Sequence, residues 1–318
     1  MSLPEAVTEA PGAHFLAEIR AQPEALAGLL EHEPAYARVA AVMRDRGATT
    51  VRLVGHGSSD NAASYGVYAF GLLPRWTAFR DSITLTVYYE SALDLTGSTV
   101  LALSQSGRTP DVIEFVSRAR KAGALTVALT NDPASALADE AEEVLPLGAG
   151  DEQAVAATKT YLNQVGALGL LAAHAAGRGD EFANGLRRTA ELVAETIPAL
   201  ELRVQTMALS FASIGRMFVI GRGTEFATAR EIALKLLETC RVAAEPLTAT
   251  DLAHGPVAAL DPLFPVWTIA SADEALPAVV DAAARVRAAG ATLVASGNAA
   301  DALADAAYVL PVPTPPSP

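Results

Sequence analysis

Short, almost continuously apolar segments recur along the chain, separated by longer segments in which apolar residues have helical spacing. Apolar segments of this length are typical of parallel strands that are covered on both faces. The expected strands are 51–54, 83–87, 99–103, 125–129 and 144–147, then 217–220, 266–270, 291–295 and 308–312. Amphipathic helices are expected between them, for example over 110–122 and 276–289. This alternation predicts an α/β fold with right-handed crossovers and doubly wound, flavodoxin-like parallel sheets.

The same pattern occurs twice. Residues 55–57 (Gly-His-Gly) follow a strand in the first half, residues 221–223 (Gly-Arg-Gly) follow one in the second half, and each turn precedes a helical pattern. Two such strand–turn–helix copies in one chain indicate duplicated α/β units. We therefore expect an N-terminal helical segment (1–45), a first domain (46–186), a linking helix (187–212) and a second domain (213–318).

Length and composition agree with this division. The 318 residues suffice for two domains of about 150 residues each, and 51% of them are hydrophobic. Cys240 is the only cysteine, and we interpret it as a small buried hydrophobic residue. No apolar segment approaches the ~20 residues that span a bilayer, and no export signal opens the chain. These features predict a cytoplasmic protein.

The charge of the chain limits its partners. The formal net charge is −13 and runs of Lys or Arg are absent, so neither nucleic acid nor an anionic membrane is expected as a partner. An acidic protein must bind a phosphate group locally, through backbone amides, hydroxyls and helix N-termini. No histidine pair has the spacing of a zinc site, so no metal is expected.

The strongest local signal is the segment 104–109 (Ser-Gln-Ser-Gly-Arg-Thr), which lies between an expected strand and a helix that starts at Pro110. Thr109 has the N-cap position of that helix, directly before the proline. Hydroxyl donors, a glycine that permits close approach and a helix N-terminus are what a phosphate requires. The segment therefore predicts a phosphate site at the carboxyl end of a strand. The alternative is an ordinary polar loop that caps a helix.

The two Gly-x-Gly turns are weaker signals. A dinucleotide fingerprint requires a third glycine where this chain has Asp60 and Phe226, so no nicotinamide cofactor is expected. Ser59 is interpreted as another hydroxyl that faces the ligand, and His56 as a structural residue.

Two further groups of residues could perform acid–base chemistry. Glu231, Lys235 and Glu238 have the spacing i, i+4 and i+7 and share one helix face. That face is either a solvated row of ion pairs or the wall of a cleft, in which a carboxylate beside a lysine serves as general base. His254, in the sequence His-Gly-Pro, is either a structural histidine or a proton shuttle near neutral pH.

In combination, these motifs resemble the SIS (sugar isomerase) family, in particular the isomerase half of glucosamine-6-phosphate synthase and, most closely, the type II glucosamine-6-phosphate deaminases. The resemblance implies two tandem SIS units and an enzyme without a cofactor. It spans about residues 51–312, and its motifs occur in the family's order: 57–59, 104–107, 155–159, 231–238 and 254–256.

The resemblance also implies roles for individual residues. The groups around the sugar phosphate would be Ser59, Ser104, Gln105, Ser106 and Thr109. Val155 would contact the sugar, and Glu238 would move a proton between C1 and C2 with Lys235 beside it. His254 would open the sugar ring in the site of a neighbouring subunit, which implies a homodimer with a shared active site.

The implied reaction converts glucosamine 6-phosphate to fructose 6-phosphate and ammonia through an enediol or enamine. The chain shows no glutaminase segment, which disfavours synthesis from glutamine. The alternatives are an aminotransferase-like isomerase, a deglycase of sugar–amine phosphates and, in another class, a non-catalytic sugar-phosphate sensor. Five of the last eight residues are prolines, so the C-terminal helix and lysine-bearing tail of the relatives are expected to be missing.

Overall fold

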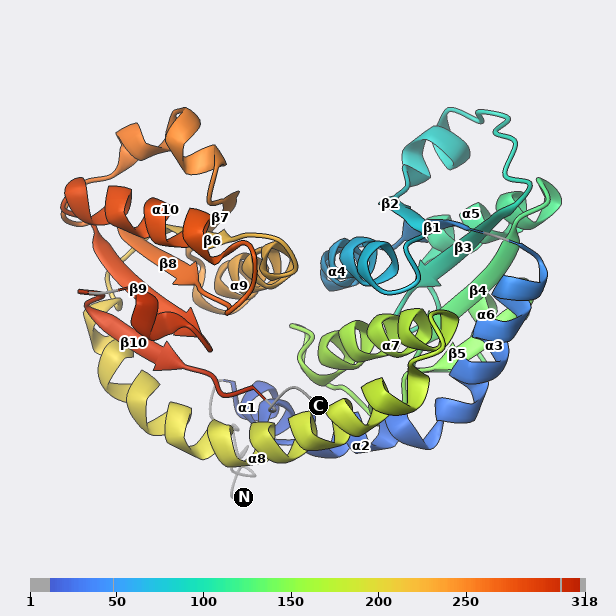
Figure 1. Cartoon of the computed structure of the whole chain (residues 1–318), viewed down its shortest axis with the longest axis horizontal. Helices are drawn as coiled ribbons and strands as arrows, with labels where there is room; N and C mark the ends of the chain where they lie inside the picture. The colour runs from blue at the N-terminus through green and yellow to red at the C-terminus, as the bar shows by residue number, and fades with distance from the viewer. Residues whose placement is uncertain (1–11, 48, 304, 315–318) are drawn as a thin grey trace, which may run out of the picture.

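The computed structural model describes residues 12–47, 49–303 and 305–314, which fold into two units above one long helix (Figure 1). The strands of the first unit are β1 Thr50–Val54, β2 Thr77–Arg80, β3 Ser98–Leu103, β4 Leu125–Thr130 and β5 Glu143–Pro146. The strands of the second unit are β6 Arg216–Gly221, β7 Ala243–Thr248, β8 Pro265–Ile269, β9 Thr292–Gly297 and β10 Tyr308–Pro311.

Each unit contains one parallel sheet with the same strand order. The first sheet runs β2-β1-β3-β4-β5 and the second runs β10-β9-β8-β6-β7, and every pair between the described strands is parallel. Counted within its own unit, each order is 2-1-3-4-5, the flavodoxin-like arrangement. The predicted fold of two tandem, doubly wound α/β units is therefore confirmed.

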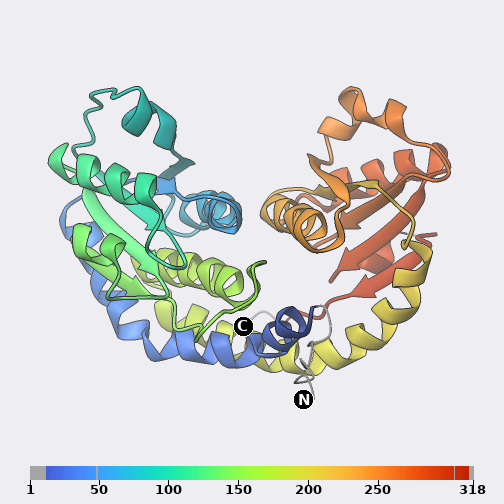
Figure 2. The same cartoon turned by 180° about the vertical axis from the view of Figure 1, so that it is seen from behind.

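Helices cover both faces of the sheets, and one of them runs beneath both units (Figure 2). The α-helices are α1 Ala13–Arg20, α2 Gln22–Glu31, α3 Glu33–Asp45, α4 Ser58–Leu72, α5 Pro110–Lys121, α6 Ala136–Glu140, α7 Lys159–Ala175, α8 Gly179–Ser210, α9 Glu225–Cys240 and α10 Leu276–Ala288. The shorter turns are η1 Thr84–Tyr88, η2 Asp251–His254, η3 Pro256–Ala259 and η4 Ala300–Ala302. None of the described helices is long and apolar enough to cross a membrane.

The expected strand 83–87 is wrong. Its residues form the π-helical turn η1, and the strand at this edge of the sheet is β2, which starts earlier in the sequence. Ile83 and Thr86 are buried and Val87 is half-buried against the first unit, whereas Leu85 is exposed. That spacing of i, i+3 and i+4 is helical, and the apolar run concealed it.

Strand β7, which lies at one edge of the second sheet, was not expected from the sequence. Its segment, Ala243–Thr248, alternates between exposed and partly covered positions and contains a proline. An edge strand is covered on fewer sides than a central one and tolerates proline. In contrast, all six residues of β3 and all six of β4 are buried, as expected for central parallel strands.

The prediction that Cys240 is buried is wrong. Cys240 is the last residue of α9, and its side chain is exposed. After β10, residues 312–314 have no regular structure. The expected absence of the C-terminal helix and tail concerns in part residues 315–318, and these lie outside the described residues.

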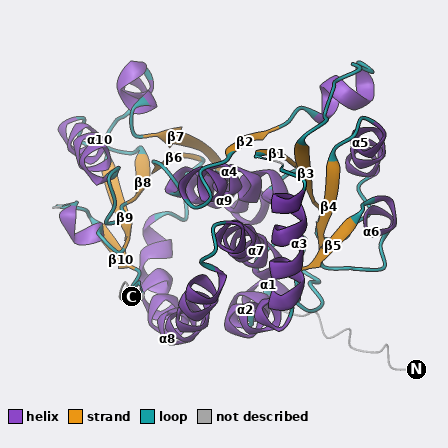
Figure 3. Ribbon diagram, turned by 45° about the vertical axis from the view of Figure 1, so that its right-hand side comes forward, coloured by secondary structure: helices purple, strands orange, loops and turns teal. Residues whose placement is uncertain are grey.

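The two units contact each other through equivalent helices. α4 follows the first Gly-x-Gly turn and α9 follows the second, and the two pack together between the sheets, with α7 beside α4 (Figure 3). This contact places the N-terminal turn of α4, in the first unit, against the middle of α9, in the second.

Candidate active site

The loop that follows β3 holds its serine hydroxyls in a tight turn. The buried Ser104 accepts a hydrogen bond through Oγ from the backbone N–H of Gly107 at 3.1 Å, and Ser106 Oγ accepts one from Arg108 N at 3.3 Å. A Cβ atom at Gly107 would lie 2.0 Å from Ser135 Oγ, and its φ is +62°. Only glycine therefore fits the tight turn that carries these hydroxyls.

Thr109 does not act as the helix cap that the sequence suggested. It has the N-cap position of α5, but its side chain makes no capping hydrogen bond. Instead its Oγ1 lies 3.1 Å from Ser104 Oγ. No side chain at the N-cap thus competes for the first amide groups of α5, which favours an anion there.

Ser59 lies in the first turn of α4, directly after the loop at which the strand order of the first sheet reverses. Its Oγ accepts a hydrogen bond from Gln164 Nε2 at 2.9 Å, and Ser59 is almost fully buried. A Cβ atom at Gly55 would lie 2.9 Å from Ser59 Cβ and 3.0 Å from the carbonyl oxygen of Leu103. The missing side chain at Gly55 therefore lets the start of α4 approach the end of β3, at the switch point where open α/β sheets bind ligands.

A pocket of about 600 Å³ opens beside the loop that follows β3. Gln105 and Ser106 are among its lining residues, so two of the residues predicted to bind the phosphate face open space. Its opposite walls come from the loops that follow β4 and β5, including Asn131 and Asp151. Asn131 is fixed there, since its Nδ2 donates to the carbonyl oxygen of Gly150 at 2.6 Å and its Oδ1 accepts from Ala149 N at 2.9 Å.

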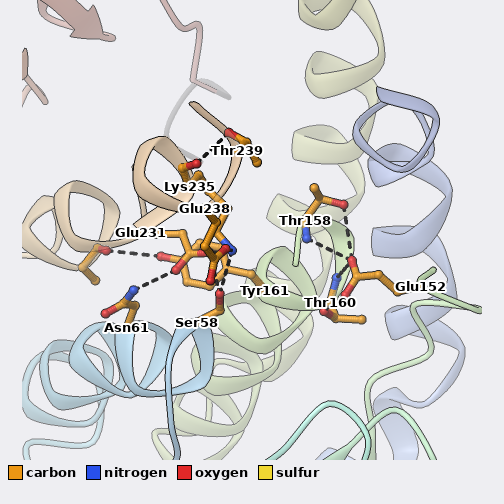
Figure 4. Close-up of polar contacts among 11 residues, drawn as sticks. Ser58, Asn61, Glu152, Thr158, Thr160, Tyr161, Glu231, Lys235, Glu238 and Thr239 are labelled. Atoms are coloured by element: carbon orange, nitrogen blue, oxygen red, sulfur yellow. Dashed lines mark hydrogen bonds and ion pairs between the residues drawn. The ribbon is translucent and has the colours of Figure 1, made fainter. Parts of the chain in front are cut away.

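The charged face of α9 is not a solvated row of ion pairs (Figure 4). The Glu231 and Lys235 side chains retain 7% and 17% of their exposure, and that of Glu238 retains 35%. Lys235 Nζ lies 3.3 Å from Glu231 Oε1 and 2.6 Å from Glu238 Oε2. The structure therefore brings together the three residues that the sequence placed on one face, and it leaves Glu238 the most accessible of them.

Residues of the first unit complete this cluster, and sequence spacing did not reveal them. Ser58 Oγ donates to Glu231 Oε1 at 2.8 Å, and Asn61 Nδ2 donates to Glu231 Oε2 at 2.8 Å. Lys235 Nζ also donates to Ser58 Oγ, at 3.1 Å. Glu231 is thus satisfied on both oxygens, whereas Glu238, among the described residues, has Lys235 as its one charged partner and remains partly exposed.

A second ion pair joins the units beside the cluster. Arg230 Nη2 lies 2.7 Å from Asp60 Oδ2, and Arg230 Nη1 donates to Ser64 Oγ at 2.5 Å. Arg80 Nη1 donates to the same carboxylate oxygen of Asp60 at 2.5 Å. No local pattern indicated these contacts, because Arg230 and each of its two partners are more than 160 residues apart in the chain.

The loop 151–158 leads into α7 and brings Val155 to the surface, where its side chain is fully exposed. Glu152 holds the end of this loop, because its Oε1 accepts hydrogen bonds from the backbone amides of Thr158 at 2.9 Å and Thr160 at 3.2 Å (Figure 4). Next to it, Tyr161 lies against α9, and burial together with Glu231 raises the pKa of its phenol well above the ordinary value. Neither Glu152 nor Tyr161 was a candidate from the sequence.

His254 is not brought into contact with the charged cluster. It is exposed at the end of η2, on the excursion between β7 and β8 at the upper rim of the second unit in Figures 1 and 2. Among the described residues it forms no hydrogen bond or ion pair. His56, by contrast, has a partner, since its Nε2 lies 2.9 Å from Asp111 Oδ2.

The family comparison matches most of the chain. The model of the SIS domain matches residues 46–175 and 210–318. Glutamine–fructose-6-phosphate aminotransferase (isomerizing) of Aeropyrum pernix is 36% identical over 304 residues, which cover 91% of this chain and 48% of that protein. The chain spans about half the length of the curated relatives it matches.

Solved structures share the architecture. A Silicibacter pomeroyi protein proposed to be a phosphosugar isomerase aligns with a TM-score of 0.79 and 34% identity over 89% of this chain and 85% of that one. The C-terminal domain of glucosamine-fructose-6-phosphate aminotransferase from Francisella tularensis aligns with a TM-score of 0.85 and 24% identity, over 96% and 90%. Glucosamine-6-phosphate deaminase from Thermotoga maritima, at 0.69 and 21% over 89% and 84%, shares the fold. These comparisons confirm the resemblance to the SIS family and to the isomerase half of the aminotransferases, and they indicate an enzyme.

Proposed function

Because the chain belongs to the SIS domain family, we propose that it moves a proton between two carbons of an amino-sugar phosphate, converting glucosamine 6-phosphate to fructose 6-phosphate and ammonia. One observation carries this proposal. Ser58, whose hydroxyl bonds to Lys235 and Glu231, directly precedes Ser59 at the start of α4. The acid–base pair of the second unit is thereby anchored to the turn that carries a hydroxyl of the phosphate site.

In this proposal the first unit binds the phosphate. Ser59, Ser104, Gln105, Ser106 and Thr109 surround it with donors, and the N-terminus of α5 supplies free amides. Val155 contacts the sugar from the adjacent loop. Binding the phosphate through neutral donors suits a chain with a net charge of −13, because cationic side chains are scarce.

The second unit then supplies the chemistry. In the open-chain substrate, Glu238 removes the proton from C2 and returns it to C1, so the C1 aldehyde becomes an alcohol and the C2 amine becomes an imine. Water then adds to the imine, ammonia leaves, and a C2 ketone remains. Lys235, 2.6 Å from Glu238, stabilises the carboxylate and the oxygen charge that develops in the enediol. The sequence is redox-neutral and consumes one water.

A glucosamine-6-phosphate synthase-like isomerase is a second candidate, because the Aeropyrum pernix relative carries the name glutamine–fructose-6-phosphate aminotransferase. The proton transfer is the same and runs in the opposite direction, with ammonia entering at C2. A deglycase would use the same steps with a larger amine as leaving group, and a sugar-phosphate sensor would use the hydroxyl loops alone.

We also propose a cytoplasmic homodimer in which His254 opens the sugar ring in the partner's site. The exposed position of His254 on η2, without a partner among the described residues, supports this proposal. An imidazole can both accept and donate a proton, so it is suited to moving the proton of the ring oxygen.

Incubation of the purified chain with glucosamine 6-phosphate tests the proposal, with ammonia and fructose 6-phosphate measured separately. Equal release of both products supports the deaminase. Turnover only with fructose 6-phosphate and added ammonia favours the synthase-like isomerase instead. Absence of turnover in both directions, together with thermal stabilisation by the sugar phosphate, would contradict the enzyme assignment and favour a sensor. The Glu238→Gln variant controls for contaminating activity.

A further inference from the structure

We propose that Glu18 of α1 is a positioning residue that holds the sugar-contacting loop 151–158 in place. α1 precedes both segments that match the SIS domain. The inference rests on the proposed function, in which Val155 at the exposed tip of this loop contacts the sugar. It gives the N-terminal helix a role in shaping the active site.

The contact is a pair of charge-assisted hydrogen bonds from the loop backbone. The amide of Gln153 donates to Glu18 Oε1 at 2.5 Å, and the amide of Ala154 lies 3.3 Å from each carboxylate oxygen. These two amides immediately precede Val155. Bonds to a carboxylate are about twice as strong as those between neutral groups, so they fix the direction of the backbone at the tip.

Because Glu18 is buried, loss of this contact would leave its carboxylate without hydrogen-bond partners and would cost free energy. Glu18 retains only 6% of its exposure, and among the described residues it forms no ion pair. A buried carboxylate must be compensated by hydrogen bonds or a cation, and here the loop amides provide the compensation. The helix and the loop therefore order each other.

The base of the loop has separate anchors, which leaves the tip dependent on Glu18. Glu152 accepts hydrogen bonds from the amides of Thr158 and Thr160, and the Lys159 ammonium donates to the carbonyl oxygen of Asp151. These contacts secure residues at either end of the loop, but they do not reach the backbone next to Val155.

α1 has an independent polar attachment that provides a matched control. Arg20 donates through Nε and Nη2 to the two carboxylate oxygens of Glu201, on α8, at 2.8 and 2.7 Å. Arg20→Ala removes this attachment on the same helix, two residues from Glu18, and leaves the loop contact in place. An effect specific to the loop must therefore appear with Glu18 variants and not with Arg20→Ala.

The test combines amide hydrogen exchange with steady-state kinetics on the full chain. In Glu18→Gln the carboxamide keeps the volume, but its NH₂ group faces the Ala154 N–H, so two donors oppose each other. We expect exchange within 151–158 to accelerate roughly tenfold, with global stability retained, because a local opening loses its main restraint. The KM for glucosamine 6-phosphate should rise by more than kcat falls. Ala154→Pro, which deletes the second amide, should raise KM in the same way.

Unchanged exchange in 151–158, or acceleration spread evenly over the first unit, would overturn the inference. So would a loop response to Arg20→Ala equal to that of Glu18→Gln. The exchange measurement does not depend on turnover, so it remains decisive if the wild-type chain has no deaminase activity. Loosening of the loop in an inactive wild-type background would support the contact while contradicting the proposed function.

Discussion

The two units share a strand order and a Gly-x-Gly turn, but they differ at each position where a phosphate would bind. Strand pairing places Val54 opposite Ala102 in the first unit and Ile220 opposite Thr268 in the second, which sets the two loops in register. The hydroxyl positions of the first loop then correspond to alanines of the second: Ser104 to Ala270, Ser106 to Ala272 and Thr109 to Ala275.

The second unit also places acidic groups where an anion would lie. The position of Gly107 corresponds to Asp273, and that of Ser59 corresponds to Glu225. Glu225 Oε1 accepts a hydrogen bond from Ser271 Oγ at 2.6 Å, which consumes a hydroxyl of that loop. Carboxylates repel a phosphate, so the loops of the second unit are less suited to bind one than those of the first.

The two copies of a duplicated fold can thus contribute different groups to one site. The first unit retains the hydroxyl loop, and the second contributes Lys235 and Glu238 on α9. The two halves meet where Ser58 contacts both Lys235 and Glu231. We therefore expect one sugar-phosphate site per chain, at the contact between the units.

The largest effect is expected from removing the chemistry of the second unit. Glu238→Gln should lower kcat by about 10²–10⁴-fold, because a positioned general base contributes that much, and should spare binding of the sugar phosphate. Turnover and calorimetric titration measure the two quantities separately. Glu245→Gln, an exposed carboxylate of β7, is the control. Equal loss of binding and turnover would contradict the division between the units.

Removing a hydroxyl from the first unit should weaken binding instead. Ser106→Ala makes the loop resemble its counterpart in the second unit and should cost ~1–3 kcal/mol of binding free energy, for a lost bond to a charged group. Titration with glucosamine 6-phosphate measures it. Ser271→Ala, which removes a hydroxyl from the corresponding loop of the second unit, should leave affinity unchanged. The assignment fails if the two variants behave alike.

Uncoupling the units should reduce stability. Glu231→Gln places an NH₂ group against Ser58 or Asn61, both of which donate to the carboxylate, and removes the ion pair with Lys235. We expect the free energy of unfolding to fall by about 1–3 kcal/mol, the cost of unsatisfied buried donors. Denaturant titration measures this change. An unchanged midpoint would show that Glu231 contributes little to the contact between the units.

The smallest effect concerns alkaline pH and a tyrosine of the first unit whose pKa is raised in part by Glu225 of the second. Burial and Glu225 raise the pKa of Tyr65, in the first unit, to about 12. Its stabilising contribution is therefore complete below pH 10 and is lost as the pH rises toward 12, by about 1 kcal/mol at pH 11. Tyr65→Phe should flatten the decline in stability above pH 10, and Tyr88→Phe, at an exposed tyrosine, should not. Equal slopes in the two variants would contradict the assignment.

Local sequence features determined much of the molecule. Continuous apolar runs such as Leu125–Thr130 identified the central strands, because a central parallel strand is buried on both faces whatever surrounds it. The glycine of the Ser-Gln-Ser-Gly motif identified a tight turn after β3, since the turn at Gly107 admits no side chain. The spacing of Glu231, Lys235 and Glu238 placed them on one face through helical geometry alone.

Other features depended on tertiary contacts and left no local signal. The apolar run after Ile83 became a helical turn because its buried side faces the first unit, and the edge strand β7 has too few covered positions to show a strand pattern. The partners of Glu231 lie 170 and 173 residues away, and the amides that bind Glu18 lie 135 and 136 residues away. Local sequence specifies which groups are present on each element, but only the packing of the two units decides which of them meet.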